Sequence, residues 1–220
     1  MQGASQSEAS GPAPANGVAG LVLAGGRSTR FGGEKAVAEI EGRPLLLWAV
    51  LRLRALCADV AVNARPGAET EALALASGLT VLHDAAGDPD GPLAGVKVGL
   101  AWAARRGARA LAVSPCDAPL LPDDLFQRLA EAAGDGAAMA VTEEGRQPLC
   151  ALWPVSALQV VTEALAGGAH PPTWRTLEGI GARQVRFEPP EAFANVNTPA
   201  DLAAAALRLR RLREGGLPSV

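Results

Sequence analysis

The sequence predicts an α/β protein with a mainly parallel sheet that is covered by helices. From residue 18 onward, short apolar runs typical of strands alternate with segments of helical periodicity. The first run, residues 18–24, is almost continuously apolar, as expected of a strand whose two faces are both covered in a parallel sheet. The chain has 220 residues, of which 49% are hydrophobic and 20% charged, so it can bury a sizeable core. One large domain is the simplest interpretation.

The first part of the chain contains four strand and helix pairs. We expect strands at residues 18–24, 59–63, 79–82 and 110–113, and helices at 44–57, 69–76, 93–106 and from 122 onward. Pro44 opens the first helix at a position where its missing N–H does no harm. Asp123 and Asp124 fall in the first turn of the fourth helix, where acidic side chains are favourable. The predicted order is therefore βαβαβαβα.

The last part of the chain is mixed. The apolar runs at 137–142 and 148–153 are expected to be strands that pair with each other or join the edge of the sheet. A loop-rich stretch around HPPTWRTLEG precedes a strand at 184–187 and a final helix, capped by Thr198-Pro199 and running to about Arg213. We expect a disordered N-terminal tail at 1–17, one ordered domain at 18–213 and a flexible tail at 214–220.

Composition and charge exclude several classes of protein. The 20 basic and 23 acidic side chains leave a formal charge of −3, so no global field attracts nucleic acid or an anionic membrane. The first 17 residues lack the apolar core of a signal peptide, and apolar stretches elsewhere are too short to span a bilayer. Three widely spaced cysteines, without Cys-x-x-Cys spacing, indicate a reducing compartment and no structural zinc. We expect a soluble, cytoplasmic protein.

A glycine-rich basic loop follows the first strand. The segment LVLAGGRSTRFGGEK, residues 21–35, contains four glycines together with Arg27, Arg30 and Lys35. Glycines let backbone N–H groups approach an anion closely, and fixed cations neutralise its charge. The loop therefore predicts a polyphosphate site and a nucleotide enzyme.

The spacing of this loop excludes two common nucleotide motifs. A Walker A loop requires Gly-Lys-Ser/Thr, but Lys35 lies between Glu34 and Ala36. A dinucleotide fingerprint requires G-x-G-x-x-G, whereas Gly25 is followed directly by Gly26. A plain glycine-rich turn between a strand and a helix is the alternative, and the three basic residues argue against it.

Polar groups end three of the predicted parallel strands, where ligands bind in such sheets. They are the basic loop, Asn63 and Asp117. Asp117 ends an apolar strand between Pro115 and Pro119, which stiffen its backbone, and a rigid carboxylate suits Mg²⁺ together with phosphate oxygens. The alternative role for Asp117 is to cap the following turn.

Several other polar residues have weaker signals. Asp84 follows the third strand, and GPLAG at 91–95 starts a helix whose free N–H groups could receive a phosphate or a base edge. Asn197 precedes the last helix, and its first interpretation from the sequence is an N-cap of that helix. Cys116 reads as a small buried apolar group, and His83 and His170 are isolated.

Four motifs in order, LAGGRSTRFGGEK, GPLAG, PCDAPLL and FANVNTP, resemble those of the molybdenum cofactor guanylyltransferases, the MobA family, across about residues 18–202. The first motif is shared by the wider nucleotidyltransferases, whereas GPLAG, NVNTP and Leu-Ala-Gly-Gly favour the guanylyl branch. The resemblance implies a three-layer αβα glycosyltransferase-A-like fold. Glu34 and Ala200 depart from the family pattern, which commonly has Asp and Glu at these positions.

The resemblance also implies roles for particular residues. Nucleotide binding would fall to eight residues, namely Leu23, Ala24, Gly25, Gly26, Lys35, Asn63, Asp84 and Asp117. Arg30 and Lys35 would stabilise charge on the phosphates as catalytic residues, and Asp117 would hold the cofactor Mg²⁺. Asn195 and Asn197 would lie on the acceptor side.

The implied reaction transfers GMP from GTP to the phosphate of molybdopterin, with release of pyrophosphate. The partners would be GTP, molybdopterin, and proteins that supply molybdopterin or accompany molybdoenzymes. Three alternatives stay open. They are a cytidylyl- or sugar-phosphate nucleotidyltransferase, a non-catalytic nucleotide-binding module, and a nucleic-acid role resting only on the basic run RLRRLRE, which also reads as the solvated face of a terminal helix.

Overall fold

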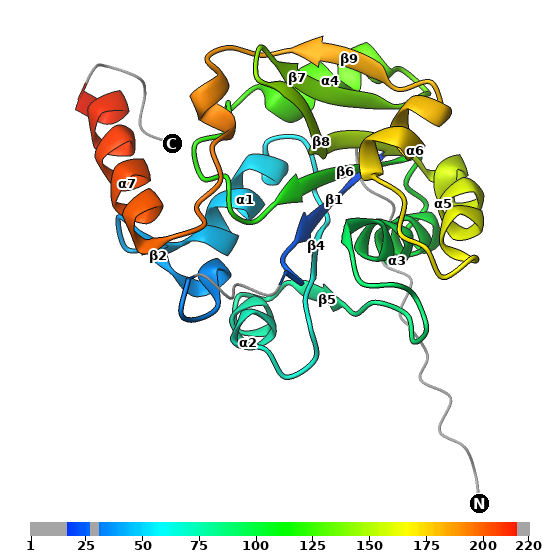
Figure 1. Ribbon diagram of the computed structural model, residues 1–220, viewed down its shortest axis with the longest axis horizontal. Coiled ribbons are helices and arrows are strands. Elements are labelled where there is room, and N and C mark those ends of the chain that lie inside the picture. The colour runs from blue at the N-terminus through cyan, green and yellow to red at the C-terminus, as the bar shows by residue number, and fades with distance from the viewer. Residues whose placement is uncertain (1–16, 27–30, 215–220) are drawn as a thin grey trace, which may run out of the picture.

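The computed structural model of the chain describes residues 17–26 and 31–214 (Figure 1). Arg27, Arg30 and nearly all of the two expected tails, 1–17 and 214–220, lie outside these residues. The elements up to the fourth long strand are β1 (Val18–Leu23), η1 (Lys35–Val37), β2 (Glu39–Ile40), β3 (Arg43–Pro44), α1 (Leu45–Arg54), β4 (Val60–Asn63), α2 (Glu69–Ala76), β5 (Thr80–Leu82), α3 (Pro92–Arg105) and β6 (Ala110–Pro115).

The second part of the chain continues in the same alternating manner and then adds short elements. They are α4 (Leu125–Ala133), β7 (Ala138–Thr142), β8 (Gly145–Pro154), η2 (Val155–Ala157), α5 (Leu158–Leu165), α6 (Thr173–Gly179), β9 (Arg183–Arg186), η3 (Pro190–Phe193) and α7 (Pro199–Glu214).

A seven-stranded sheet lies at the centre, in the order β5-β4-β1-β6-β8-β7-β9. β1 pairs in parallel with β4 and β6, and β4 pairs in parallel with β5. β8 is antiparallel to both of its neighbours, β6 and β7, whereas β9 is parallel to β7. The mainly parallel mixed sheet predicted from the sequence is therefore confirmed, and the strands at 138–142 and 145–154 both pair with each other and join the sheet.

Helices cover both faces of this sheet (Figure 1). Along β1, Val18 and Val22 pack in the cluster formed with α1 and α4, whereas Ala19 and Leu21 pack with α3, α5 and α6. All four side chains are at most 1% exposed, which explains why β1 reads as an unbroken apolar run. The three-layer αβα arrangement is confirmed.

A hairpin between η1 and α1 was not expected from the sequence. Its strands, β2 and β3, have two residues each, too few for a periodic pattern, and Glu41 and Gly42 turn it with positive φ angles of 53° and 72°. The hairpin contributes Ile40 to a separate apolar cluster with Trp48 of α1 and Leu209 of α7. This cluster holds α7 at the side of the molecule, next to β2 (Figure 1).

One helix, α6, lies in the loop-rich stretch expected around residues 170–179, and α5 is a further helix for which no element was expected. α6 begins directly after Pro172, within the stretch expected to be a loop, and α5 precedes it. Both helices are short. Each buries one leucine, Leu165 in α5 and Leu177 in α6, on the face of the sheet that α3 also covers. Packing, more than intrinsic propensity, stabilises helices of this length.

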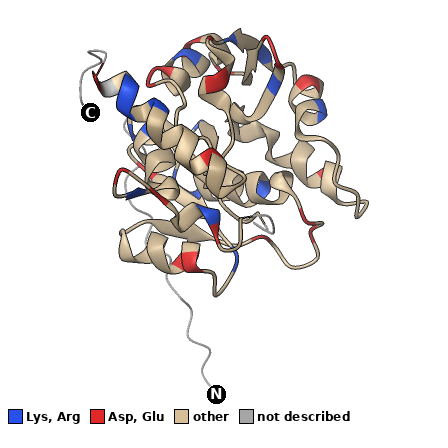
Figure 2. Cartoon of the chain, turned by 60° about the vertical axis from the view of Figure 1, so that its left-hand side comes forward, with Lys and Arg blue, Asp and Glu red and all other residues tan. Residues whose placement is uncertain are grey.

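The basic run at the C-terminal end of α7 lies near the C-terminus in Figure 2. Arg208 pairs with Glu191 at 3.4 Å and Arg210 with Glu41 at 2.6 Å. These pairs agree with a solvated face that neighbouring acids partly neutralise. Within residues 17–26 and 31–214, no helix is both long enough and apolar enough to cross a bilayer.

Gly99 is predicted to be required for the close contact of α3 with the sheet. A Cβ at this position would lie 2.6 Å from Leu21 Cδ2 and 3.0 Å from Leu111 Cδ2, both in the packed core. We expect Gly99→Ala to destabilise the protein by about 1–3 kcal/mol, because overpacking outweighs the roughly 1 kcal/mol that alanine gains in a helix. Thermal or urea unfolding measures this.

Gly179→Ala is the matched control, since a Cβ at this helical position meets nothing within 4 Å. It should leave stability unchanged or raise it slightly. If Gly99→Ala were equally neutral, α3 would not pack so closely on Leu21 and Leu111 that a Cβ is excluded.

Candidate nucleotide-binding site

A cavity of about 410 Å³ opens at the carboxyl ends of β1, β4, β5 and β6. Crevices of α/β sheets bind ligands at this edge, because the loops that follow parallel strands converge there. The cavity is lined by Leu23, Ala24, Gly25, Gly26, Glu34, Lys35, Ala36, Asn63, Arg65, Thr70, Asp84, Asp90, Gly91, Pro92, Pro115, Cys116, Asp117 and Leu149. All eight residues predicted to bind the nucleotide are among them, so the structure brings together positions that are up to 94 residues apart in the sequence.

The end of β1 is fixed by its two neighbouring strands. The N–H of Ala24 donates to the Asn63 carbonyl at 2.9 Å, and the N–H of Cys116 donates to the Leu23 carbonyl at 3.2 Å. At Gly25 a Cβ would already lie 3.4 Å from Asn63 Oδ1. The backbone that leads into the basic loop is therefore rigid, and its small residues leave the cavity open. Arg30 lies outside the described residues, so its role stays a prediction.

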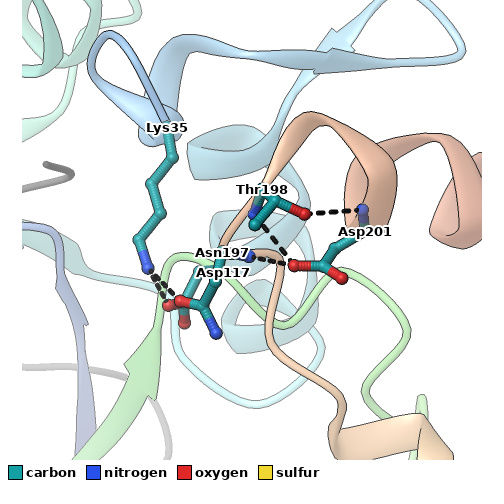
Figure 3. Close-up of polar contacts among 5 residues, drawn as sticks. All are labelled: Lys35, Asp117, Asn197, Thr198 and Asp201. Atoms are coloured by element: carbon teal, nitrogen blue, oxygen red, sulfur yellow. Dashed lines mark hydrogen bonds and ion pairs between the residues drawn. The ribbon is translucent and has the colours of Figure 1, made fainter. Parts of the chain in front are cut away.

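Lys35, Asp117 and Asn197 meet beside the cavity (Figure 3). The Lys35 ammonium donates to the Asp117 carboxylate and, at 3.2 Å, to Asn197 Oδ1. The side chains of Lys35 and Asp117 are only 18% and 13% exposed. The backbone also links two of these segments, because the Val196 N–H donates to the Asp117 carbonyl at 2.7 Å. Three distant parts of the chain thus meet at one ion pair.

The start of α7 differs from the expectation that Asn197 caps this helix. Thr198 and Asp201 form the cap: the Asp201 carboxylate accepts the N–H groups of Asn197 and Thr198 at 3.0 and 2.8 Å, and Thr198 Oγ1 accepts the Asp201 N–H at 3.2 Å (Figure 3). The Asn197 side chain is thereby free to reach Lys35. Asn195 is exposed and is not among the described residues that line the cavity.

Asn63 joins the ends of β4 and β5. It is 4% exposed, and its Nδ2 donates to Asp84 Oδ1 at 2.8 Å and to the Leu82 carbonyl at 3.3 Å. Gly95 of α3 faces this amide so closely that a Cβ there would lie 2.5 Å from Asn63 Oδ1. The GPLAG segment therefore starts α3 and, because Gly95 has no side chain, also leaves room for the Asn63 amide.

The first turn of α3 has a partner that the sequence did not indicate. The Leu93 N–H donates to His170 Nε2 at 3.0 Å, and a Cβ at Gly91 would lie 2.3 Å from the same ring. The view of His170 as isolated is wrong, because the ring caps α3 from a loop 77 residues later. His83 also has a partner, Glu71, at 2.7 Å.

Cys116 lines the cavity next to Asp117 but is unsuited to nucleophilic chemistry. Burial raises the pKa of its thiol to about 12, and the Asp117 charge acts in the same direction. The thiol is therefore protonated at neutral pH, as expected of a small buried apolar group.

The residues present fit a hard divalent cation bound together with phosphate. Asp117 offers carboxylate oxygens, which Mg²⁺ prefers, and the ammonium that it contacts demonstrates that a cation is favourable at this place. Among the described residues, no group of three His, Cys, Asp or Glu side chains could form an all-protein cage. Mg²⁺ commonly binds through one or two carboxylates plus phosphates, and that arrangement is available here.

Sequence reasoning missed four polar residues of the cavity wall as binding-site residues, namely Glu34, Arg65, Thr70 and Asp90. The Glu34 carboxylate accepts the Thr70 backbone N–H and hydroxyl and pairs with the Arg65 guanidinium. Arg65 had a usable signal, since it follows the strand end at Asn63 by two residues. The link between Glu34 and Thr70 had none, because the two are 36 residues apart.

Comparison with known proteins agrees with this geometry. A molybdenum cofactor guanylyltransferase of Cereibacter sphaeroides is 41% identical over 194 residues, which cover 87% of this chain and 97% of that protein. The crystal structure of molybdopterin-guanine dinucleotide biosynthesis protein A from Archaeoglobus fulgidus superposes with a TM-score of 0.67 at 22% identity, covering 87% of this chain and 98% of that one.

The same fold occurs in a cytidylyltransferase. The 2-C-methyl-D-erythritol 4-phosphate cytidylyltransferase from Thermus thermophilus superposes with a TM-score of 0.65 at 21% identity, over 86% of this chain and 98% of that one. The predicted nucleotidyltransferase fold is thereby confirmed. Residues 20–180 match the MobA-like NTP transferase domain. The chain therefore belongs to the MobA-like NTP transferase family.

Proposed function

We propose that this protein transfers GMP from GTP to the terminal phosphate of molybdopterin, which yields the guanine dinucleotide cofactor and pyrophosphate. The observation that carries the proposal is the ion pair of Lys35 with Asp117 on a cavity that also contains the glycine-rich strand end. The names of the similar proteins support the choice of GTP and of the molybdenum cofactor as substrates.

The reaction joins two anions, so charge neutralisation and alignment are the main tasks of the site. An acceptor phosphate oxygen forms a bond to the α-phosphorus of GTP, and the bond from that phosphorus to the pyrophosphate oxygen breaks. No covalent enzyme intermediate is needed, which agrees with the protonated Cys116 thiol. The acceptor phosphate is largely ionised near neutral pH, so a general base is not needed either.

Lys35 and Asp117 have different electrostatic roles. Asp117 would hold the Mg²⁺ ion, which when bound supplies positive charge next to the phosphates. The Lys35 ammonium lies on a flexible four-carbon stem and can turn from Asp117 to phosphate oxygens. Arg30, five residues before Lys35 on the same loop, would add charge to the leaving pyrophosphate.

The remaining residues position the two substrates. The backbone of Leu23, Ala24, Gly25 and Gly26 would contact the guanine nucleotide, and Asn63 and Asp84 would bind its guanosine part. Asn197, which contacts Lys35, and Asn195, two residues before it, would face the acceptor. Further partners would be proteins that deliver molybdopterin or receive the product, and three buried free cysteines suit a reducing cytoplasm.

The proposed reaction is tested by a nucleotide comparison. Purified protein with Mg²⁺ and molybdopterin should release pyrophosphate with GTP and give little release with CTP or UTP. GTP should also raise the melting temperature more than the other nucleotides, because binding to the folded state stabilises it. Preference for CTP would favour the cytidylyl alternative, and binding without pyrophosphate release would favour a non-catalytic module.

Asp117→Asn and Lys35→Met are predicted to lower kcat by about 10²- to 10³-fold each, because each removes a charge that acts on the phosphates. Both variants should retain the circular dichroism spectrum of the wild type. Asp135→Asn, a fully exposed acid outside the cavity, is the control and should keep wild-type turnover. Near-normal turnover of Asp117→Asn would remove this residue from the mechanism.

Gly95→Ala is predicted to weaken GTP binding by about 3- to 10-fold. The new Cβ would displace the Asn63 side chain and break its hydrogen bond to Asp84, and one such bond is worth about 0.5–1.5 kcal/mol. Calorimetry with GTP and Mg²⁺ measures the change. Gly167→Ala, where a Cβ meets nothing within 4 Å, should bind GTP as the wild type does, and equal affinity for both variants would contradict the role of Asn63.

A further inference from the structure

A second cationic side chain, Arg65, reaches the cavity from the loop after β4. Its guanidinium Nη2 lies 3.3 Å from Glu34 Oε1, and its side chain is 47% exposed. The backbone beneath it is fixed, because the neighbouring Ala64 N–H donates to the Leu82 carbonyl at 3.1 Å and the Arg65 carbonyl accepts the Ala68 N–H at 3.2 Å. Arg65 therefore extends its guanidinium from a fixed backbone.

Glu34 holds this guanidinium in place because it is itself anchored to α2. Its carboxylate accepts the Thr70 N–H at 2.8 Å and the Thr70 hydroxyl at 2.6 Å. Thr70 is 2% exposed and lies in the first turn of α2, where N–H groups lack partners within the helix and negative charge is favourable.

The charge state of Glu34 fits this role. Burial alone would raise the pKa of its carboxyl, but the hydrogen bonds from Thr70 and the charge of Arg65 outweigh burial, and the pKa is lowered from its ordinary value. Glu34 is therefore an anion at neutral pH.

The pair is too exposed to be explained by fold stability. Ion pairs that are this accessible to solvent contribute about 0–1 kcal/mol. Glu34 uses one N–H of the guanidinium for the pair, and a guanidinium has five N–H donors in a planar fork that matches phosphate oxygens. Arg65 can bind an anion in the cavity while it keeps its bond to Glu34.

The charge of the cavity makes such a contact valuable. Its described lining includes two cationic side chains, Lys35 and Arg65, and four carboxylates, those of Glu34, Asp84, Asp90 and Asp117. A triphosphate is strongly anionic, and Lys35 already contacts Asp117. Arg65 is thus one of only two cations that the described part of the cavity offers to the phosphates.

We propose that Arg65 is an additional phosphate-binding residue of the nucleotide site and that Glu34 is its positioning residue. The inference rests on the proposed use of GTP. It assigns Arg65 to the phosphate end because the guanidinium pairs with Glu34, which directly precedes Lys35, whereas Asn63 and Asp84 bond to each other at the nucleoside end.

The test compares GTP with GMP by calorimetry in the presence of Mg²⁺. Arg65→Gln should lose about tenfold in GTP affinity, equivalent to about 1.4 kcal/mol, and should bind GMP within twofold of the wild type. Arg65→Lys keeps the positive charge but lacks the planar guanidinium with its several N–H donors. It should recover part of the GTP affinity that Arg65→Gln loses. A merely structural role would lower both affinities equally.

Arg186→Gln is the matched control, because Arg186 also pairs with a glutamate, is 65% exposed and lies on β9 away from the cavity. It should bind both nucleotides as the wild type does. Equal affinity of wild type and Arg65→Gln for GTP, or equal losses for GTP and GMP, would overturn the inference alone. Wild-type protein that binds no guanine nucleotide would overturn the proposed function as well.

The role of Glu34 is tested by Glu34→Gln in the same assay. If Glu34 positions Arg65, this variant should bind GTP about threefold more weakly and GMP unchanged, because the neutral amide no longer holds the guanidinium. If the carboxylate only repelled the phosphates, its removal would increase GTP affinity. An increase would therefore contradict the positioning role.

Discussion

The ion pair between Lys35 and Asp117 is the interaction on which the site depends. Each charge is largely removed from solvent, and a charge in such a place requires a partner. The pair joins the end of the basic loop to the end of β6, and Asn197 adds the segment before α7. The parallel sheet makes this possible, because it directs the ends of four strands toward one edge.

Much of the fold could be predicted because its signals are local. The buried strand β1 and the helices that follow β1, β4, β5 and β6 have apolar patterns long enough to identify, and their order fixes the parallel sheet. The β2–β3 hairpin, α5 and α6 could not be predicted, because they are short and depend on partners elsewhere. Leu177 of α6, for example, is buried only because β8 and α5 lie against that helix.

Some residues of the site could likewise be predicted from local signals, and others could not. Residues at or just beyond the end of a strand, such as Asn63 and Asp117, could be placed at one edge from the order of strands alone. Contacts such as Glu34 with Thr70 or Leu93 with His170 could not, since nothing local in the sequence pairs a loop carboxylate with a helix start or a histidine with an N–H 77 residues away. The cap of α7 is local by contrast: Thr198 was expected to cap this helix and does so together with Asp201, and only the expectation for Asn197 is wrong.

The cavity contains two ion pairs, Lys35 with Asp117 and Arg65 with Glu34, and these affect how a reaction between anions can occur there. Lys35 neutralises Asp117, and Arg65 neutralises Glu34, each within a geometry held by backbone or helix contacts. A phosphate that enters the cavity therefore meets two cations that are already in place: Lys35 exchanges one oxygen partner for another, whereas Arg65 keeps its bond to Glu34. Such exchange requires little reorganisation, and fixed charges of this kind stabilise a transition state more effectively than mobile water does. The Asp117 carboxylate that Lys35 leaves behind then favours binding of a divalent cation together with the nucleotide, because its charge again needs a partner.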